Sequence, residues 1–150
     1  MPQSLSVVLL HLVFSAKNRD PLIHPEIEAD LHAFLGAIAR DCGCVALAIG
    51  GTEDHVHLLC SLSRNICIAD FVEELKTRSS KWIKTKGRAY SEFHWQSGYG
   101  VFSMGKSQED ALKRYIATQK EHHRRVSFQE EFRAILGKYG VEFDERYVWD

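Results

Sequence analysis

Residues 45–62 constrain the fold more strongly than any other segment, because they read as two β-strands joined by a tight turn. An apolar run at 45–49 is followed by the turn sequence GGTE and then by alternating residues from position 55. Side chains two positions apart on a strand share a face, so His55 and His57 are predicted to lie side by side. Val56, Leu58 and Cys60 then point to the opposite, apolar side. The segment therefore predicts an antiparallel sheet with one packed face and one polar face.

The flanking sequence adds helices and further strands to this hairpin. Strand patterns cover residues 6–14 and 95–104, and helical spacing covers residues 26–40, 68–84, a stretch that begins at Ser107, and 128–136. The order strand, helix, strand, strand, helix, strand predicts an α+β fold of the ferredoxin-like or RRM-like kind. We expect an antiparallel sheet with helices on one face, the histidine pair on a central strand, and the second face open.

The length of 150 residues fits one domain, since domains most often have roughly 100–150 residues. We expect a single domain over residues 1–150, with an acidic and aromatic C-terminal tail at about 137–150. The longest apolar runs are too short to span a bilayer, and no export signal is visible at the N-terminus, so a cytoplasmic protein without membrane contact is expected. Cys42-Gly-Cys44 lacks the spacing of a zinc ribbon, and no second cysteine pair of that kind follows.

The net charge is −1, but the charges are segregated along the chain. Residues 76–88 read KTRSSKWIKTKGR, with six basic residues and no acid. Such a cluster can form a phosphate-binding stripe, and it can equally be a solvated helix face. The candidate DNA contacts are Lys76, Arg78, Lys81, Lys84, Lys86 and Arg88.

Two residues of the third expected helix carry chemistry that complements the histidine pair. Tyr115 and Gln119 are four positions apart, so a continuous helix places them on one face about one turn apart. A phenol can act as a nucleophile, and an amide oxygen with two imidazoles suits Mg²⁺ or Mn²⁺, of which Mn²⁺ matches imidazole better. From these residues alone, a non-catalytic histidine pair and a core tyrosine are the more common interpretations.

The chain resembles the single-tyrosine transposases of the IS200/IS605 group, which belong to the HUH endonuclease superfamily. The resemblance is carried, in family order and over nearly the whole chain, by five segments. They are EDHVHLL (53–59), LKTRSSKWIK (75–84), HWQSGYGVFSMG (94–105), YIATQKEHH (115–123) and SFQEEF (127–132), together with KNRDPLI (17–23).

The resemblance implies a role for each matching position. Tyr115 would be the nucleophile, and His55, His57 and Gln119 would hold a divalent cation. The implied activity is cleavage and rejoining of single-stranded DNA at hairpin-bearing element ends through a 5′-phosphotyrosine intermediate. A homodimer is also implied, and no nucleotide cofactor is needed because the phosphotyrosine bond conserves the phosphodiester energy.

Several weaker expectations remain. Asp54 and His123 are candidates to orient the site from outside the ligand set, and His122 and His11 have no assigned role, with His11 interpreted as a core histidine. Two other functions stay open. One is a non-catalytic single-stranded nucleic-acid-binding protein on the same fold, and the other is a metal hydrolase that uses the histidine pair to activate water.

Overall fold

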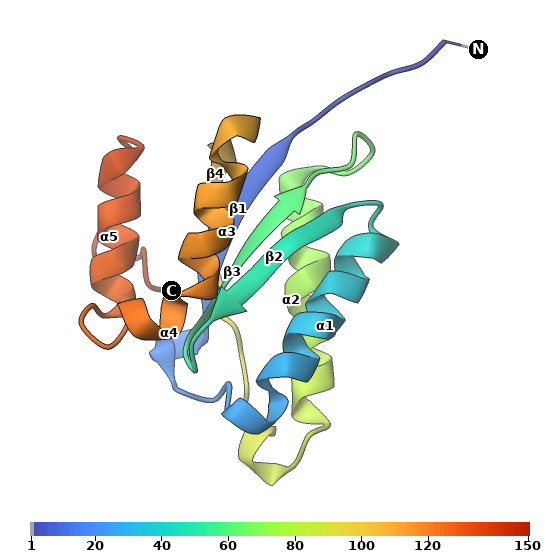
Figure 1. Ribbon diagram of the computed structural model, residues 1–150. Coiled ribbons are helices and arrows are strands. Elements are labelled where there is room, and N and C mark those ends of the chain that lie inside the picture. The colour runs from blue at the N-terminus through green and yellow to red at the C-terminus, as the bar shows by residue number, and fades with distance from the viewer. Residues whose placement is uncertain (1) are drawn as a thin grey trace.

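A computed structural model describes residues 2–150, and its element order confirms the predicted α+β class (Figure 1). The sheet and the first two helices follow the ferredoxin-like sequence of elements. Their bounds are β1 Leu9–Ser15, α1 Pro25–Asp41, β2 Val45–Gly51, β3 His55–Ser61, α2 Ile68–Lys84 and β4 Gly100–Met104. Three further helices follow β4, and short 3₁₀ turns lie at Lys17–Arg19, Arg88–Tyr90 and Lys106–Gln108. The later helices are α3 Glu109–Ala117, α4 Gln119–His122 and α5 Phe128–Lys138.

The four strands form one antiparallel sheet in the order β2-β3-β1-β4. This is the order of a ferredoxin-like fold, and it places β3, with His55 and His57, beside β1 at the centre. The register pairs Leu12 with Leu58 and Val13 with His57. The prediction of a histidine pair on a central strand is therefore confirmed.

Helices α1 and α2 cover one face of the sheet and form the main apolar core. Alternate residues of β1 and β3 point into it, among them Leu12, Phe14, Val56 and Leu58, and each of these is fully buried. The helices contribute amphipathic stripes at three- and four-residue spacing. These are Ile27, Leu31, Leu35 and Ile38 from α1, and Phe71, Val72, Leu75 and Ile83 from α2.

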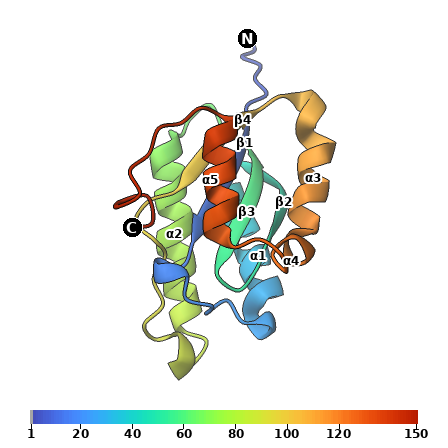
Figure 2. The same cartoon turned by 90° about the vertical axis from the view of Figure 1, so that its left-hand side faces the viewer.

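The second face of the sheet is not open, in contrast to the sequence-based expectation. Helices α3 and α5 lie over it, with α5 in front of β1 and β3 in Figure 2, and His55 and His57 have no exposed surface. The reason is that both helices carry apolar side chains, which are buried by packing on the sheet. Leu112 and Ile116 of α3 pack on Leu9 and Leu59, while three residues of α5 pack on the sheet beside them. These α5 residues are Phe128, Phe132 and Leu136, and they pack with Val13 and Phe102 of the sheet.

The last strand is shorter than its sequence pattern indicated. It begins at Gly100 rather than at residue 95, and Trp95 forms only an isolated bridge with Ala16. The chain turns between these points, and the Lys76 ammonium donates hydrogen bonds to the carbonyls of Gln96 (2.7 Å), Ser97 (3.3 Å) and Gly98 (2.5 Å). Lys76 therefore anchors a turn of the fold.

The C-terminal tail folds back against α5 and the nearby turn. The Trp149 ring lies near Phe132, with ring centroids 6.1 Å apart, and the Gly98 N–H donates to the carbonyl of Asp150 at 2.8 Å. Within residues 2–150, every helix is too short or too polar to traverse a lipid bilayer.

Candidate active site

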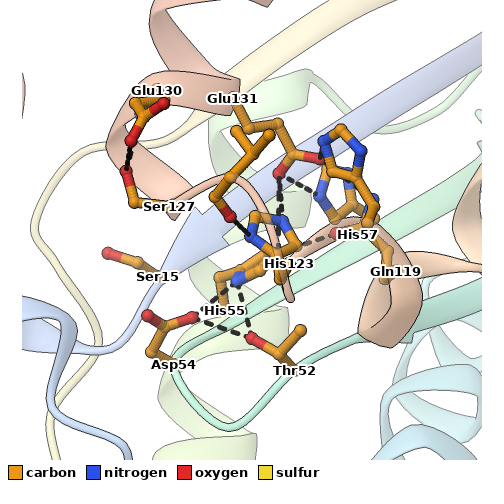
Figure 3. Close-up of polar contacts among 12 residues, drawn as sticks. Ser15, Thr52, Asp54, His55, His57, Gln119, His123, Ser127, Glu130 and Glu131 are labelled. Carbon is orange, nitrogen blue, oxygen red and sulfur yellow. Dashed lines mark hydrogen bonds and ion pairs between the residues drawn. The ribbon is translucent and has the colours of Figure 1, made fainter.

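Strand β3 places two imidazoles in the interface between the sheet and the later helices (Figure 3). Because the residues between and beyond them are apolar and face the main core, the strand cannot rotate without burying the imidazoles in that core. His57 Nδ1 lies 2.7 Å from His11 Nε2, and His55 Nδ1 lies 2.7 Å from Asp54 Oδ1. The Nδ1 atom of each imidazole thus has a hydrogen-bond partner, and its Nε2 atom faces the later helices.

Tyr115 and Gln119 reach the same place, although not on one continuous helix as predicted. Helix α3 ends at Ala117, Thr118 has non-helical dihedral angles (φ −104°, ψ 19°), and α4 begins at Gln119. The Thr118 hydroxyl donates to the carbonyl of Arg114 at 3.0 Å, which satisfies the end of α3. The Gln119 side chain is buried and its Oε1 atom lies 2.8 Å from His55 Nε2.

Glu131 of α5 stands at the centre of the site and was missed at the sequence level. It is only 3% exposed, and its Oε1 atom lies 3.0 Å from the Nε2 atoms of both His57 and His123. Its Oε2 atom accepts hydrogen bonds from the Tyr115 hydroxyl and from Gln119 Nε2, the latter at 2.9 Å. The carboxylate therefore joins the phenol, the amide and the imidazoles in one network.

A signal for Glu131 was present in the sequence. It follows Phe128 by three positions and directly precedes Phe132, so it lies within the apolar stripe of its own helix. A carboxylate on the buried stripe of a helix requires polar partners, and these come from β3, from α3 and from the segment of α4 and its C-cap residue. Recognising it required knowing that this stripe faces the histidines.

The electrostatics of the network follow from burial and from Glu131. Burial acts to raise the pKa of Glu131, but hydrogen bonds from His123 and His57 outweigh it and hold that pKa well below its usual range. Burial lowers the pKa of His57 to about 4 and the pKa of His11 to about 3. Burial raises the pKa of Tyr115, and the hydrogen bond to Glu131 raises it further. The described site thus holds a carboxylate, neutral His11 and His57, and a protonated phenol.

Asp54 and His123 both lie next to His55. Asp54 also accepts a hydrogen bond from the Thr52 hydroxyl at 2.9 Å, which fixes the carboxylate behind His55. Burial acts to raise the pKa of Asp54, but its bond to His55 lowers it on balance. The centroids of the His123 and His55 rings are 4.4 Å apart, and His123 Nδ1 lies 2.7 Å from the carbonyl oxygen of Val126.

His11 is not an isolated core histidine but lies on the same face as the pair on β3, stacked on His57 with ring centroids 5.0 Å apart. His122 also borders the site, since its Nε2 atom lies 3.4 Å from Glu131 Oε2.

Helix α2, which carries most of the candidate basic residues, lies on the other side of the sheet from α3 (Figure 1). The Lys76 ammonium donates to backbone carbonyls, as described above, and the Arg78 guanidinium donates to the Asp41 carboxylate at 2.9 Å. Lys84 donates to the Ser80 hydroxyl at 3.3 Å. Lys81, Lys86 and Arg88 are exposed, although the Lys86 ammonium lies over the Trp82 ring at 4.4 Å.

The donor set fits a divalent cation. One ligand atom from each of His55, His57, His123 and Glu131 can be chosen so that all lie within 4.8 Å of one another. Gln119 Oε1 adds an amide oxygen beside His55. Imidazole nitrogens with carboxylate and amide oxygens are donors that bind divalent ions of the first transition row as well as Mg²⁺.

The site thus combines a ferredoxin-like sheet, a buried histidine pair, a neighbouring tyrosine and a set of donor atoms that could hold a cation. Residues 4–119 match the family model described as "Transposase IS200 like". The chain belongs to this family of transposases.

Individual relatives agree with this assignment. The chain is 26% identical over 116 residues to the ISDra2 transposase TnpA of Deinococcus radiodurans, covering 74% of this chain and 83% of the relative. A crystal structure of a transposase from Deinococcus radiodurans R1 superposes with a TM-score of 0.62 at 24% identity, covering 79% of this chain and 98% of the other. A REP-associated tyrosine transposase bound to a REP hairpin superposes with a TM-score of 0.61 at 14% identity, covering 84% and 76%. These two structures share the fold of this chain.

Proposed function

We propose that this protein cleaves and rejoins single-stranded DNA at hairpin-bearing element ends, with Tyr115 as the nucleophile. The observation that carries the proposal is the convergence of Tyr115, Gln119 and the histidine pair within one chain, although they come from three separate elements. Family membership supports the transposase class, and one solved structure of the same fold is described as bound to a REP hairpin.

Substrate access to the phenol is provided by a cleft between α3 and α5. The cleft has a volume of about 530 Å³ and its lining includes His11, Tyr115 and Glu131. Single-stranded DNA that enters this cleft would meet the phenol before it meets His55 and His57, which are fully buried and do not line the cleft. The cleft is therefore the expected path of the scissile phosphate.

The chain's residues divide the work of the reaction. The phenol oxygen of Tyr115 forms a bond to phosphorus as the bond from phosphorus to the 3′-oxygen breaks. The phenol loses one proton and the leaving 3′-oxygen gains one to become a hydroxyl, so the step is balanced in protons. His55, His57 and Gln119 would hold Mg²⁺ or Mn²⁺, which when bound polarises the phosphate. Asp54 and His11 keep the two imidazoles oriented, and the 5′-phosphotyrosine permits rejoining to another 3′-hydroxyl without a nucleotide cofactor.

DNA outside the cleft would contact the basic residues of α2 and of the turn that follows it. Lys81, Lys86 and Arg88 are exposed and can neutralise backbone phosphates of the hairpin, with Lys84 and Arg78 beside them. The family resemblance also implies a homodimer, and we propose it as the assembled form of this protein.

A metal hydrolase is a second candidate, because the structure adds His123 and Glu131 to the histidine pair. That reaction would yield free DNA ends, whereas a transposase of this kind leaves DNA attached to Tyr115. A protein that only binds DNA would yield neither product.

The deciding experiment incubates the protein with a single-stranded hairpin oligonucleotide, with and without Mn²⁺, and separates the products on a denaturing gel. The wild type should give a covalent protein–DNA adduct only with the cation. Tyr115→Phe should abolish the adduct and leave hairpin affinity within about two-fold, because it removes one hydroxyl outside the basic surface. Adducts formed by the variant, or cleavage by the wild type without adducts, would overturn the proposal.

A further inference from the structure

Among residues 2–150, Glu131 is the one carboxylate that contacts both the imidazoles and the Tyr115 phenol, and the activity proposed above gives it no task. Its two oxygens have different neighbours. Oε1 lies 3.0 Å from His57 Nε2 and 3.5 Å from His55 Nε2. Oε2 accepts from the Tyr115 hydroxyl and from Gln119. One oxygen thus faces the imidazoles and the other faces the nucleophile.

Helix α5 holds this carboxylate firmly in place. The Ser127 hydroxyl accepts from the N–H of Glu130 and begins the helix, and Phe128 and Phe132 are buried on either side of Glu131. Because these rings pack on the sheet, Glu131 cannot withdraw to solvent without removing the helix from its face. Burying a carboxylate so completely is costly unless cationic partners surround it.

We propose that Glu131 is an additional donor to the cation site and also positions the Tyr115 phenol, so that α5 couples the cation to the nucleophile. This inference rests on the proposed function and extends it by one residue. The imidazole-facing oxygen lies among the donors that fit a divalent ion, and the other oxygen holds the phenol at the edge of that site.

The coupling has a consequence that a purely structural role for Glu131 does not have. If the cation and the phenol share one carboxylate, removing the phenol must change cation affinity, and it must do so only while Glu131 is present. A residue that merely fills space would alter stability equally with and without the cation.

The test measures Mn²⁺ affinity by calorimetry or electron paramagnetic resonance on the wild type, Glu131→Gln, Tyr115→Phe and the double variant. Glutamine keeps the shape of the side chain but removes its charge. We expect Glu131→Gln to weaken Mn²⁺ binding by about 10-fold or more. Tyr115→Phe should change the affinity by about 3-fold in the wild-type background and leave it unchanged in the Glu131→Gln background.

The neighbouring Glu130→Gln is the matched control, because Glu130 is exposed on the same helix. Its Mn²⁺ affinity should equal that of the wild type. Thermal unfolding with and without Mn²⁺ supplies a second readout, in which Glu131→Gln should reduce the rise in Tm that Mn²⁺ causes.

The outcomes separate the two proposals. A wild type that binds no Mn²⁺ would overturn the proposed function and this inference together. Equal Mn²⁺ affinity of the wild type and Glu131→Gln, or an equal loss of Tm with and without Mn²⁺, would overturn only the role of Glu131.

Discussion

The two faces of the sheet use alternate residues of the same two strands, yet they are held together in different ways. On the α1/α2 face, β1 and β3 contribute leucine, phenylalanine and valine to a continuous apolar core. On the α3/α5 face, they contribute three buried histidines between two smaller apolar clusters. Among the described residues, every buried side-chain polar atom has a hydrogen-bond partner.

This difference shows how a small domain can separate stability from chemistry. Apolar packing needs only the right volume and periodicity, whereas a buried polar network needs each partner in place. The apolar face should therefore control unfolding, and the polar face should control the reaction. The predictions below test that division, beginning with the largest expected change in stability.

Leu58→Ala should lower the free energy of unfolding by about 2–5 kcal/mol, because the side chain is fully buried in the main core and leaves a cavity. Urea unfolding followed by circular dichroism measures the loss. The control is Leu5→Ala at a side chain that is 85% exposed, which should stay within about 0.5 kcal/mol of the wild type. A loss below 1 kcal/mol for Leu58→Ala would contradict the assignment of stability to this face.

Gly50→Ala should separate the phenol from the histidines. A Cβ at this position of β2 would lie 2.5 Å from the carbonyl oxygen of Ile116, so α3 would have to move. We expect a loss of about 1–3 kcal/mol in stability and a fall of at least about 10-fold in covalent adduct. Adduct yield equal to the wild type would show that α3 does not need this close approach.

Gly36→Ala is the matched change on the other face, because a Cβ there meets only Ile49 Cδ1 at 3.9 Å. This substitution lies within α1 and should stabilise the protein by about 0.5–1 kcal/mol without altering adduct yield.

Lys81→Gln should have the smallest effect, confined to DNA binding. Lys81 is exposed on α2, and removing one phosphate contact should reduce the slope of log affinity against log salt by about 0.7–0.9. Fluorescence anisotropy of a labelled hairpin at several salt concentrations measures the slope. An unchanged slope would remove Lys81 from the DNA-binding surface, while stability should be unaffected in either case.

The same contrast explains how much of the molecule could be predicted from sequence. The central sheet, α1 and α2 could be predicted because period-two and helical patterns are local properties of the chain. The positions of His55 and His57 on one face follow from the same alternation. Which face α3 and α5 would cover could not be predicted, because it depends on contacts between residues far apart in sequence.

Only part of the candidate site could be predicted from the sequence. Tyr115, Gln119 and the histidine pair could be proposed from the family resemblance, and the structure brings them together. The role of Glu131 could not be predicted in this way, since a glutamate in a helix is ordinarily exposed and its partners lie 8 to 76 positions away. The break at Thr118 was likewise hidden, because residues 115–119 have no glycine or proline to mark it.

The interleaved use of β1 and β3 also limits how this chain can change in length. Inserting or deleting one residue inside residues 55–61 would turn the imidazoles toward the leucines of the main core and the leucines toward Glu131. Both layers would fail at once, so indels among descendants should be confined to connecting loops, such as residues 62–67 between β3 and α2.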